Sequence, residues 1–179
     1  MAANPLSHQM ANTRQARRPY PRSQERTLIL ALGNRMRSDD GVAGEVMAGL
    51  SSRACIPASV DLLDGGNAGM KILSLIEGYD QVIIIDAADM GLKPGRWVRL
   101  TLNELLHHAL IQRADNTLHG ADLVDALMIG DAMQTLPRKI SIYAIQPLDT
   151  HEGIGLSPEM RAYIPVICDS IMAEIGAPG

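Results

Sequence analysis

The sequence contains no phenylalanine and only one tryptophan, although 46% of its 179 residues are hydrophobic. Leucine, isoleucine, valine, alanine and methionine must therefore fill the core. There are only two cysteines, Cys55 and Cys168, and they form no C-x-x-C pair. This usage favours reduced, buried thiols in a cytoplasmic protein over a structural disulfide.

Several functional signatures are also missing. No stretch reaches the roughly 20 apolar residues that a membrane-spanning helix needs. The sequence has no G-x-S-x-G nucleophile motif, no phosphate-binding P-loop and no G-x-G-x-x-G dinucleotide-binding motif. If the chain is an enzyme, its chemistry therefore rests on other residues.

Basic residues are concentrated at the start of the chain. Residues 1–26 hold five arginines and one glutamate, a net charge of +4, whereas the rest holds 11 basic and 19 acidic residues, a net charge of −8. An acidic body argues against nucleic acid as the main partner and suits a cation or a basic protein surface. We expect a disordered basic arm over residues 1–26, followed by one monomeric domain over residues 27–176.

The apolar pattern predicts an α/β fold. Continuous apolar runs at 28–32 and 82–85 are typical of strands buried on both faces. Residues 139–145 are predicted to form another strand, and residues 60–63 a shorter one. Segments with helical spacing separate these strands, which predicts a three-layer domain with a mostly parallel five-stranded sheet and helices on both faces. The strand at 96–101 follows its predecessor too closely for a crossover helix, so we expect it to lie antiparallel at an edge.

In the C-terminal third of the chain, the sequence predicts a linker and a last helix. Residues 112–117 are polar and are expected to be a linker. Ser157 and Pro158 indicate the start of the last helix, since proline is favoured at the first helical position. Pro165 falls inside that helix and is expected to kink it.

Three potential metal ligands occupy comparable places. Asp40 follows the first strand, Asp86 ends the central strand, and His119 lies in the first turn of a later helix. In open α/β sheets, ligands bind at the carboxyl ends of the strands. Two carboxylates and one imidazole suit a divalent ion such as nickel or zinc, and three protein ligands leave positions open for water or substrate.

Each of these residues also has a structural interpretation. Adjacent acids at a helix start commonly cap the helix, and we assign Asp39 to the cap and Asp40 to the site. Asp86 ends a buried run and must either face a cleft or be paired. A single histidine such as His119 is commonly structural or exposed.

Other polar positions are weaker candidates. His107 and His108 are expected at the exposed end of a helix, and His151 lies in a loop. Gly65 and Gly66 are expected to serve the geometry of a turn, although a ligand can also approach the backbone there.

A set of motifs, taken in order, resembles the hydrogenase maturation endopeptidases, which process the large subunit of [NiFe] hydrogenases. The motifs are L-G-N-x-x-x-x-D-D-G-V at Leu32–Val42, L-D-G-G-x-x-G at Leu63–Gly69, V-I-I-I-D-A at Val82–Ala87, P-G-x-x-x-x-L at Pro94–Leu100, a helix-opening His119, Gln146–Pro147, and G-L-S-P-E at Gly155–Glu159.

The resemblance implies that Asp40, Asp86 and His119 take the family's three metal-contacting and catalytic positions. It implies one cut that removes the C-terminal extension of the large-subunit precursor after nickel insertion. The nickel would be carried by the substrate, with zinc or cadmium able to replace it in vitro. On this hypothesis the enzyme is a cytoplasmic endopeptidase, and a water polarised by the metal or by a carboxylate attacks the peptide carbonyl.

Two alternatives belong to other functional classes. A phospho-receiver domain also has paired acids after its first strand and an aspartate at the end of its third. Here, however, the strand at 139–145 is followed by Gln146–Pro147, where a receiver has Lys-Pro. A nickel-binding assembly factor without peptidase activity would conserve the same ligands.

Overall fold

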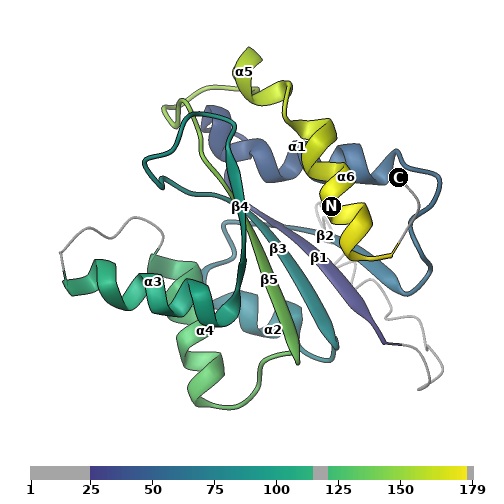
Figure 1. Cartoon of the computed structure of the whole chain (residues 1–179), viewed down its shortest axis with the longest axis vertical. Helices are drawn as coiled ribbons and strands as arrows, with labels where there is room; N and C mark the ends of the chain where they lie inside the picture. The colour runs from purple at the N-terminus through teal and green to yellow at the C-terminus, as the bar shows by residue number, and fades with distance from the viewer. Residues whose placement is uncertain (1–24, 115–120, 177–179) are drawn as a thin grey trace, which may run out of the picture.

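The computed structural model describes residues 25–114 and 121–176 (Figure 1). Within these ranges, no helix combines the length and apolar character needed to cross a bilayer. In chain order the elements are β1 (Thr27–Leu32), η1 (Ser38–Gly41), α1 (Val42–Ser51), β2 (Val60–Gly66), η2 (Gly69–Lys71), α2 (Ile72–Ile76), β3 (Gln81–Ala87), β4 (Trp97–Thr101), α3 (Leu102–Ala114), α4 (Ala121–Ala132), β5 (Lys139–Ile145), α5 (Pro158–Arg161) and α6 (Ile164–Glu174).

The five strands form one sheet in the order β2-β1-β3-β5-β4. The neighbours β2-β1, β1-β3 and β3-β5 are parallel, whereas β4 pairs antiparallel with β5 at the edge. This arrangement confirms the predicted mostly parallel sheet and its antiparallel edge strand. It also places β3, which ends in the Asp86 region, between two parallel neighbours.

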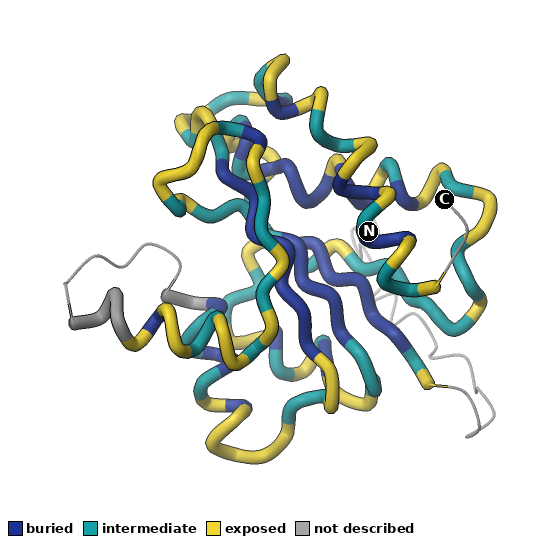
Figure 2. Tube along the Cα trace, in the orientation of Figure 1, coloured by how far each residue is buried: buried dark blue, intermediate teal, exposed yellow. Residues whose placement is uncertain are grey.

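Both faces of the sheet are covered by helices, which explains the continuous apolar strands. Ile29 and Ala31 of β1 belong to a core cluster shared with α1 and α6. Leu28 and Leu30, which alternate with them, belong to a second cluster shared with α2 and α4. Figure 1 shows these two helical layers on opposite sides of the sheet, and Figure 2 shows buried residues running along the inner strands.

The helices differ from the prediction at two places. The prediction of a single C-terminal helix with a kink at Pro165 is wrong. The segment forms two separate helices, α5 and α6, and Pro165 lies in the first turn of α6. Proline suits that position because the first turn of a helix needs no N–H donor there. The predicted linker at 112–117 is wrong for residues 112–114, which belong to α3, and residues 115–117 lie outside the described residues. The start at Ser157 is confirmed, since its side chain accepts a hydrogen bond from the backbone of Met160.

Most of the expected basic arm lies outside the described residues. Arg26, which we assigned to the end of the arm, contacts the domain. Its backbone N–H donates to Asp80 at 2.9 Å, and its guanidinium pairs with Asp61 at 2.7 Å. The guanidinium also lies over the Tyr79 ring. These contacts attach the chain to the sheet immediately before β1.

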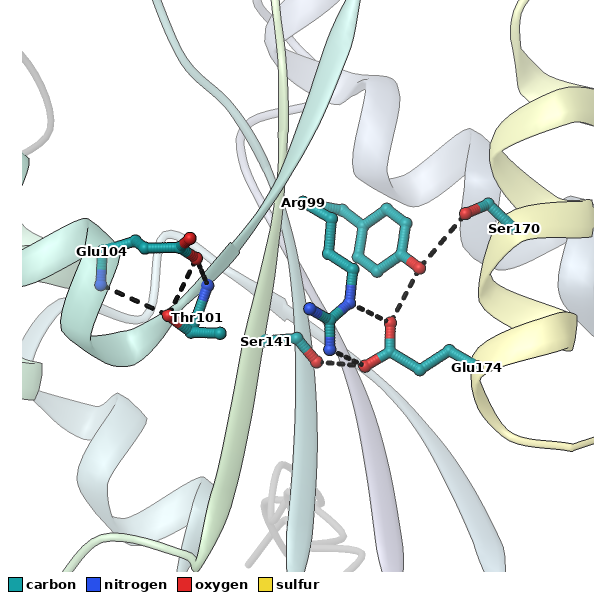
Figure 3. A network of polar contacts seen from close by, with 7 residues as sticks. Arg99, Thr101, Glu104, Ser141, Ser170 and Glu174 are labelled. Carbon is teal, nitrogen blue, oxygen red and sulfur yellow. Dashed lines mark hydrogen bonds and ion pairs between the residues drawn. The ribbon is translucent and has the colours of Figure 1, made fainter.

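A polar network joins the edge strand to α6 (Figure 3). The Arg99 guanidinium binds both carboxylate oxygens of Glu174, at 2.7 and 2.8 Å. Ser141 and Tyr143 of β5 also donate to that carboxylate. Burial raises the pKa of Tyr143 to about 12, so its hydroxyl stays protonated and can act as a donor. The network therefore ties β4, β5 and the last helix together.

Candidate active site

Asp86 stands where β3 leaves the core. The four residues before it, Val82–Ile85, are fully buried. Asp86 pairs in register with Ala144 of β5, and its side chain keeps partial access to a cavity at this edge of the sheet. The strand therefore carries a carboxylate from the apolar core to the boundary of an open space.

Asp40 reaches the same cavity from the loop after β1. Gly33 ends that strand with a φ of +125°, and a Cβ atom there would lie 2.1 Å from the carbonyl oxygen of Asp40. Only glycine allows this close approach. The Asp40 carboxylate accepts a hydrogen bond of 3.0 Å from the Asn34 backbone, so the Gly-Asn pair positions this acid.

The two carboxylates influence each other electrostatically. The pKa of Asp86 is raised from 3.8 to about 7, first by burial and second by the negative charge of Asp40, while a hydrogen bond from the Ala87 backbone partly opposes both. A cation placed between the two acids would relieve this repulsion. Paired oxygen donors of this kind fit a divalent metal ion.

The cavity has a volume of about 1090 Å³ and two chemically different ends. The polar end is lined by Arg37, Asp40, Asn67, Asp86, Asp89 and Thr150. Apolar side chains of β4, β5, α3 and α4 line the remainder, among them Val98, Leu100, Leu105, Val124 and Ile142. The site thus combines a charged mouth with an apolar recess along the sheet.

The sequence predicted three ligands, and the structure brings two of them together. Asp40 and Asp86 share the cavity, whereas His119 lies outside the described residues. Over 25–114 and 121–176, no group of three or more histidine, cysteine, aspartate and glutamate side chains could hold a metal.

The other candidates have separate surroundings. His108 is exposed on α3 and lines the cavity, with the His107 ring beside it. The exposed ring of His151 contacts the Asp149 carboxylate at 2.6 Å. The predicted turn at Gly65 and Gly66 is wrong, because both residues belong to the end of β2. Gly66 pairs with Leu32 beyond a register shift, has a φ of +51° and lines the cavity.

The assignment of Asp39 to the helix cap is wrong. The N-cap residues are Arg37 for η1 and Gly41 for α1, and neither helix start has a side-chain capping hydrogen bond. Asp39 is instead completely buried and accepts hydrogen bonds from Leu148, Asp149 and Ser157. Neighbouring side chains on a tight turn point in different directions, so one acid of the pair faces the cavity and the other faces a loop.

Gln146 is a second buried polar residue that sequence reasoning missed. Its amide oxygen accepts from the backbones of Met90 and Leu92 at 2.7 and 3.1 Å, and its amide nitrogen donates to Asp89 at 3.1 Å. It thereby holds the β3–β4 loop, which lines the cavity. The only sequence signal for Gln146 was the Gln146–Pro147 motif, one of those that resemble the hydrogenase maturation endopeptidases.

A family model described as hydrogenase maturation protease matches residues 45–174. The chain belongs to the hydrogenase maturation protease family. This membership confirms the resemblance and separates the chain from phospho-receiver domains.

Named relatives agree with that family. The chain is 28% identical over 162 residues to a hydrogenase expression/formation protein HupD of Bradyrhizobium diazoefficiens, covering 88% of this chain and 83% of that protein. It is 28% identical over 155 residues to the hydrogenase 2 maturation protease of Escherichia coli, covering 86% and 93%.

Solved structures of hydrogenase maturation proteases share the fold. The E. coli endopeptidase HybD superimposes with a TM-score of 0.72 at 28% identity, covering 85% of this chain and 94% of that one. A hydrogenase 2 maturation peptidase from a Thaumarchaeota archaeon gives a TM-score of 0.64 at 28% identity, covering 85% and 99%. The α/β architecture is therefore the architecture of known maturation peptidases.

Proposed function

We propose that this protein removes the C-terminal extension from the nickel-loaded precursor of a [NiFe] hydrogenase large subunit. Asp40 and Asp86 engage the nickel that the precursor carries, and His119 is the proposed third ligand. The protein acts in the cytoplasm as a monomer, and zinc or cadmium can stand in for nickel in vitro. Family membership supports the reaction class, and the paired carboxylates support the site.

The observation that carries the proposal is the coupling of Asp40 and Asp86 at the charged end of one cavity. Their chain positions are 46 residues apart, yet the charge of Asp40 raises the pKa of Asp86. Without a cation, bringing two carboxylates together is unfavourable. The arrangement is therefore best suited to a site that receives a metal ion with its substrate.

The reaction is hydrolysis of one peptide bond. Oxygen from water bonds to the carbonyl carbon, the C–N bond breaks, and the released amine takes a proton. The attacking water is activated by the nickel or by one of the carboxylates. Without a cation the pKa of Asp86 is about 7, and the positive charge of nickel would lower it and favour the ionised carboxylate that engages the metal.

The test is a processing assay on the purified precursor, prepared with and without nickel. Mass spectrometry follows loss of the C-terminal extension. We expect processing of the nickel-loaded precursor only. The variants Asp40→Asn, Asp86→Asn and His119→Ala should each slow processing at least about tenfold, because the first two remove a ligand's negative charge and the third removes an imidazole.

Asp131→Asn is the matched control, since Asp131 is an exposed carboxylate on α4. It should process at the parent rate. Equal processing without nickel would contradict nickel recognition, and full activity of Asp86→Asn would contradict the site. Nickel-dependent binding of the precursor without release of the extension would favour the alternative, a non-proteolytic assembly factor.

A further inference from the structure

The carboxylate of Asp39 fastens the loop after β5 to the loop after β1. Its Oδ2 atom accepts from the backbone N–H groups of Leu148 and Asp149 at 3.0 and 3.1 Å, and from the Ser157 hydroxyl at 3.0 Å. Its Oδ1 atom accepts from the Ser157 backbone at 2.7 Å. Asp39 is fully buried, so water is poorly placed to replace these bonds.

The two fastened loops form one side of the cavity mouth. Arg37 and Asp40 of the first loop and Pro147 and Thr150 of the second all line the cavity. The Arg37 guanidinium also donates to the Thr150 carbonyl at 3.1 Å. Any displacement of the second loop therefore changes the shape of the opening beside Asp40.

The same loops present large apolar side chains to solvent. Met36 is 62% exposed, Leu148 51% and Ile154 85%. Asp39 accepts directly from the backbone of Leu148, and its neighbour Ser38 donates to Gly153, next to Ile154. The buried carboxylate thus sets the position of side chains that a protein substrate would meet at this mouth.

We propose that Asp39 is a positioning residue of the peptidase, holding the loop at 147–157 in the place where the precursor binds. This inference rests on the proposed function. Asp40 is held separately by the Asn34 backbone, and Asp86 by the pairing of β3 with β5. Loss of the Asp39 clamp should therefore weaken precursor binding and leave the chemical step nearly intact.

Asp39→Asn is the decisive variant, because it keeps the size of the side chain. An asparagine has one carbonyl oxygen, and its NH₂ group cannot accept a hydrogen bond. If the oxygen faces Leu148 and Asp149, the Ser157 N–H loses its acceptor; in the opposite orientation the other two N–H groups lose theirs. Either orientation loosens the loop.

The first readout is hydrogen exchange of backbone amides in the nickel-free protein. The amides of Leu148, Asp149 and Ser157 should exchange at least about tenfold faster in Asp39→Asn, whereas those of Ile83 and Ile84 in β3 should not change. Unchanged exchange at the three loop amides would overturn the clamp. This readout does not depend on the proposed function.

The second readout is the kinetics of precursor processing at several precursor concentrations. For Asp39→Asn we expect KM to rise about tenfold and kcat to stay within about threefold of the parent. A lower kcat with unchanged KM, or no change in either, would overturn the positioning role. A parent protein that fails to process the nickel-loaded precursor would instead contradict the proposed function.

Two further variants complete the design. Asp131→Asn, an exposed carboxylate substitution, should match the parent in both readouts. Ser157→Ala removes one bond to Asp39, together with the 3.3 Å cap bond of α5, and leaves the three backbone donors to Asp39. It should raise KM by about two- to threefold, and if Asp39→Asn fails to fold, parent-like kinetics of Ser157→Ala would overturn the proposal.

Discussion

The raised pKa of Asp86 should lower the free energy of unfolding of the metal-free protein at high pH. Its pKa is about 7 in the folded chain and 3.8 in an ordinary aspartate, so the folded state keeps a proton that the unfolded state releases. Stability should therefore fall as the pH rises from about 4 to about 7 and stay reduced above that. A rise in pKa of this size corresponds to at most about 4 kcal/mol.

Asp86→Asn should abolish this penalty. We expect the variant to be more stable than the parent by about 2–4 kcal/mol at pH 8, and nearly equal to it at pH 4, because asparagine never ionises. Urea unfolding of the metal-free proteins at the two pH values measures the difference. Asp131→Asn, an exposed substitution, should show no such pH dependence, and a parent-like Asp86→Asn at pH 8 would rule out the raised pKa.

The pair Asp39–Asp40 shows what residue-level reasoning can achieve. The apolar run, the Gly-Asn break and the adjacent acids led to Asp40, which lines the same cavity as Asp86. They did not reveal which direction each acid faces. Leu148 and Ser157, the partners of Asp39, lie 109 and 118 residues away in the chain. Local spacing contains no information about such partners.

At the scale of elements, the Glu174 network should contribute measurably to stability. Burial raises the pKa of Glu174, but hydrogen bonds from Arg99, Ser141 and Tyr143 and the charge of Arg99 outweigh it, so the pKa is lowered overall. Its stabilising contribution is therefore present above the ordinary glutamate pKa and is lost as the pH falls below it.

Glu174→Gln tests this network. We expect a loss of about 1–3 kcal/mol at pH 7, because the charged acceptor of several donors is replaced by a neutral amide. The loss should shrink toward pH 3, where the parent carboxylate also becomes protonated. Chemical denaturation across this pH range gives the measurement. Glu45→Gln, at an exposed glutamate of α1, serves as the control, and a loss independent of pH would contradict the ionic contribution.

The predicted strands are confirmed because their signal is local. Each core strand is a short apolar run with a polar break at its end, and a buried parallel strand needs both. The C-terminal helix was mispredicted for the opposite reason. Met160, Ile167 and Ile171 have helical spacing and are all buried, but they belong to two helices, α5 and α6, that pack on the same cluster. Periodicity alone does not reveal such a break.

At the scale of the whole molecule, connection lengths predicted the edge strand. The segment between β3 and β4 is too short for a crossover helix, and β4 is indeed antiparallel. The convergence of β1 and β3 at one edge followed from the parallel sheet. The cavity itself, and the buried polar side chains that hold its loops, arise from contacts between distant segments and were not predictable from the sequence.

The folded chain should couple two acids that are remote in sequence, and a double-mutant cycle can measure this. Asp40→Asn and Asp86→Asn each remove one member of the same repulsive pair. Once either charge is gone, removing the other relieves less repulsion. At pH 8 the stability gain of the double variant should therefore be smaller than the sum of the two single gains by at least about 0.5 kcal/mol. At pH 4, where Asp86 is protonated in the fold, this coupling should vanish. Strictly additive gains at pH 8 would mean that the two carboxylates do not share a site.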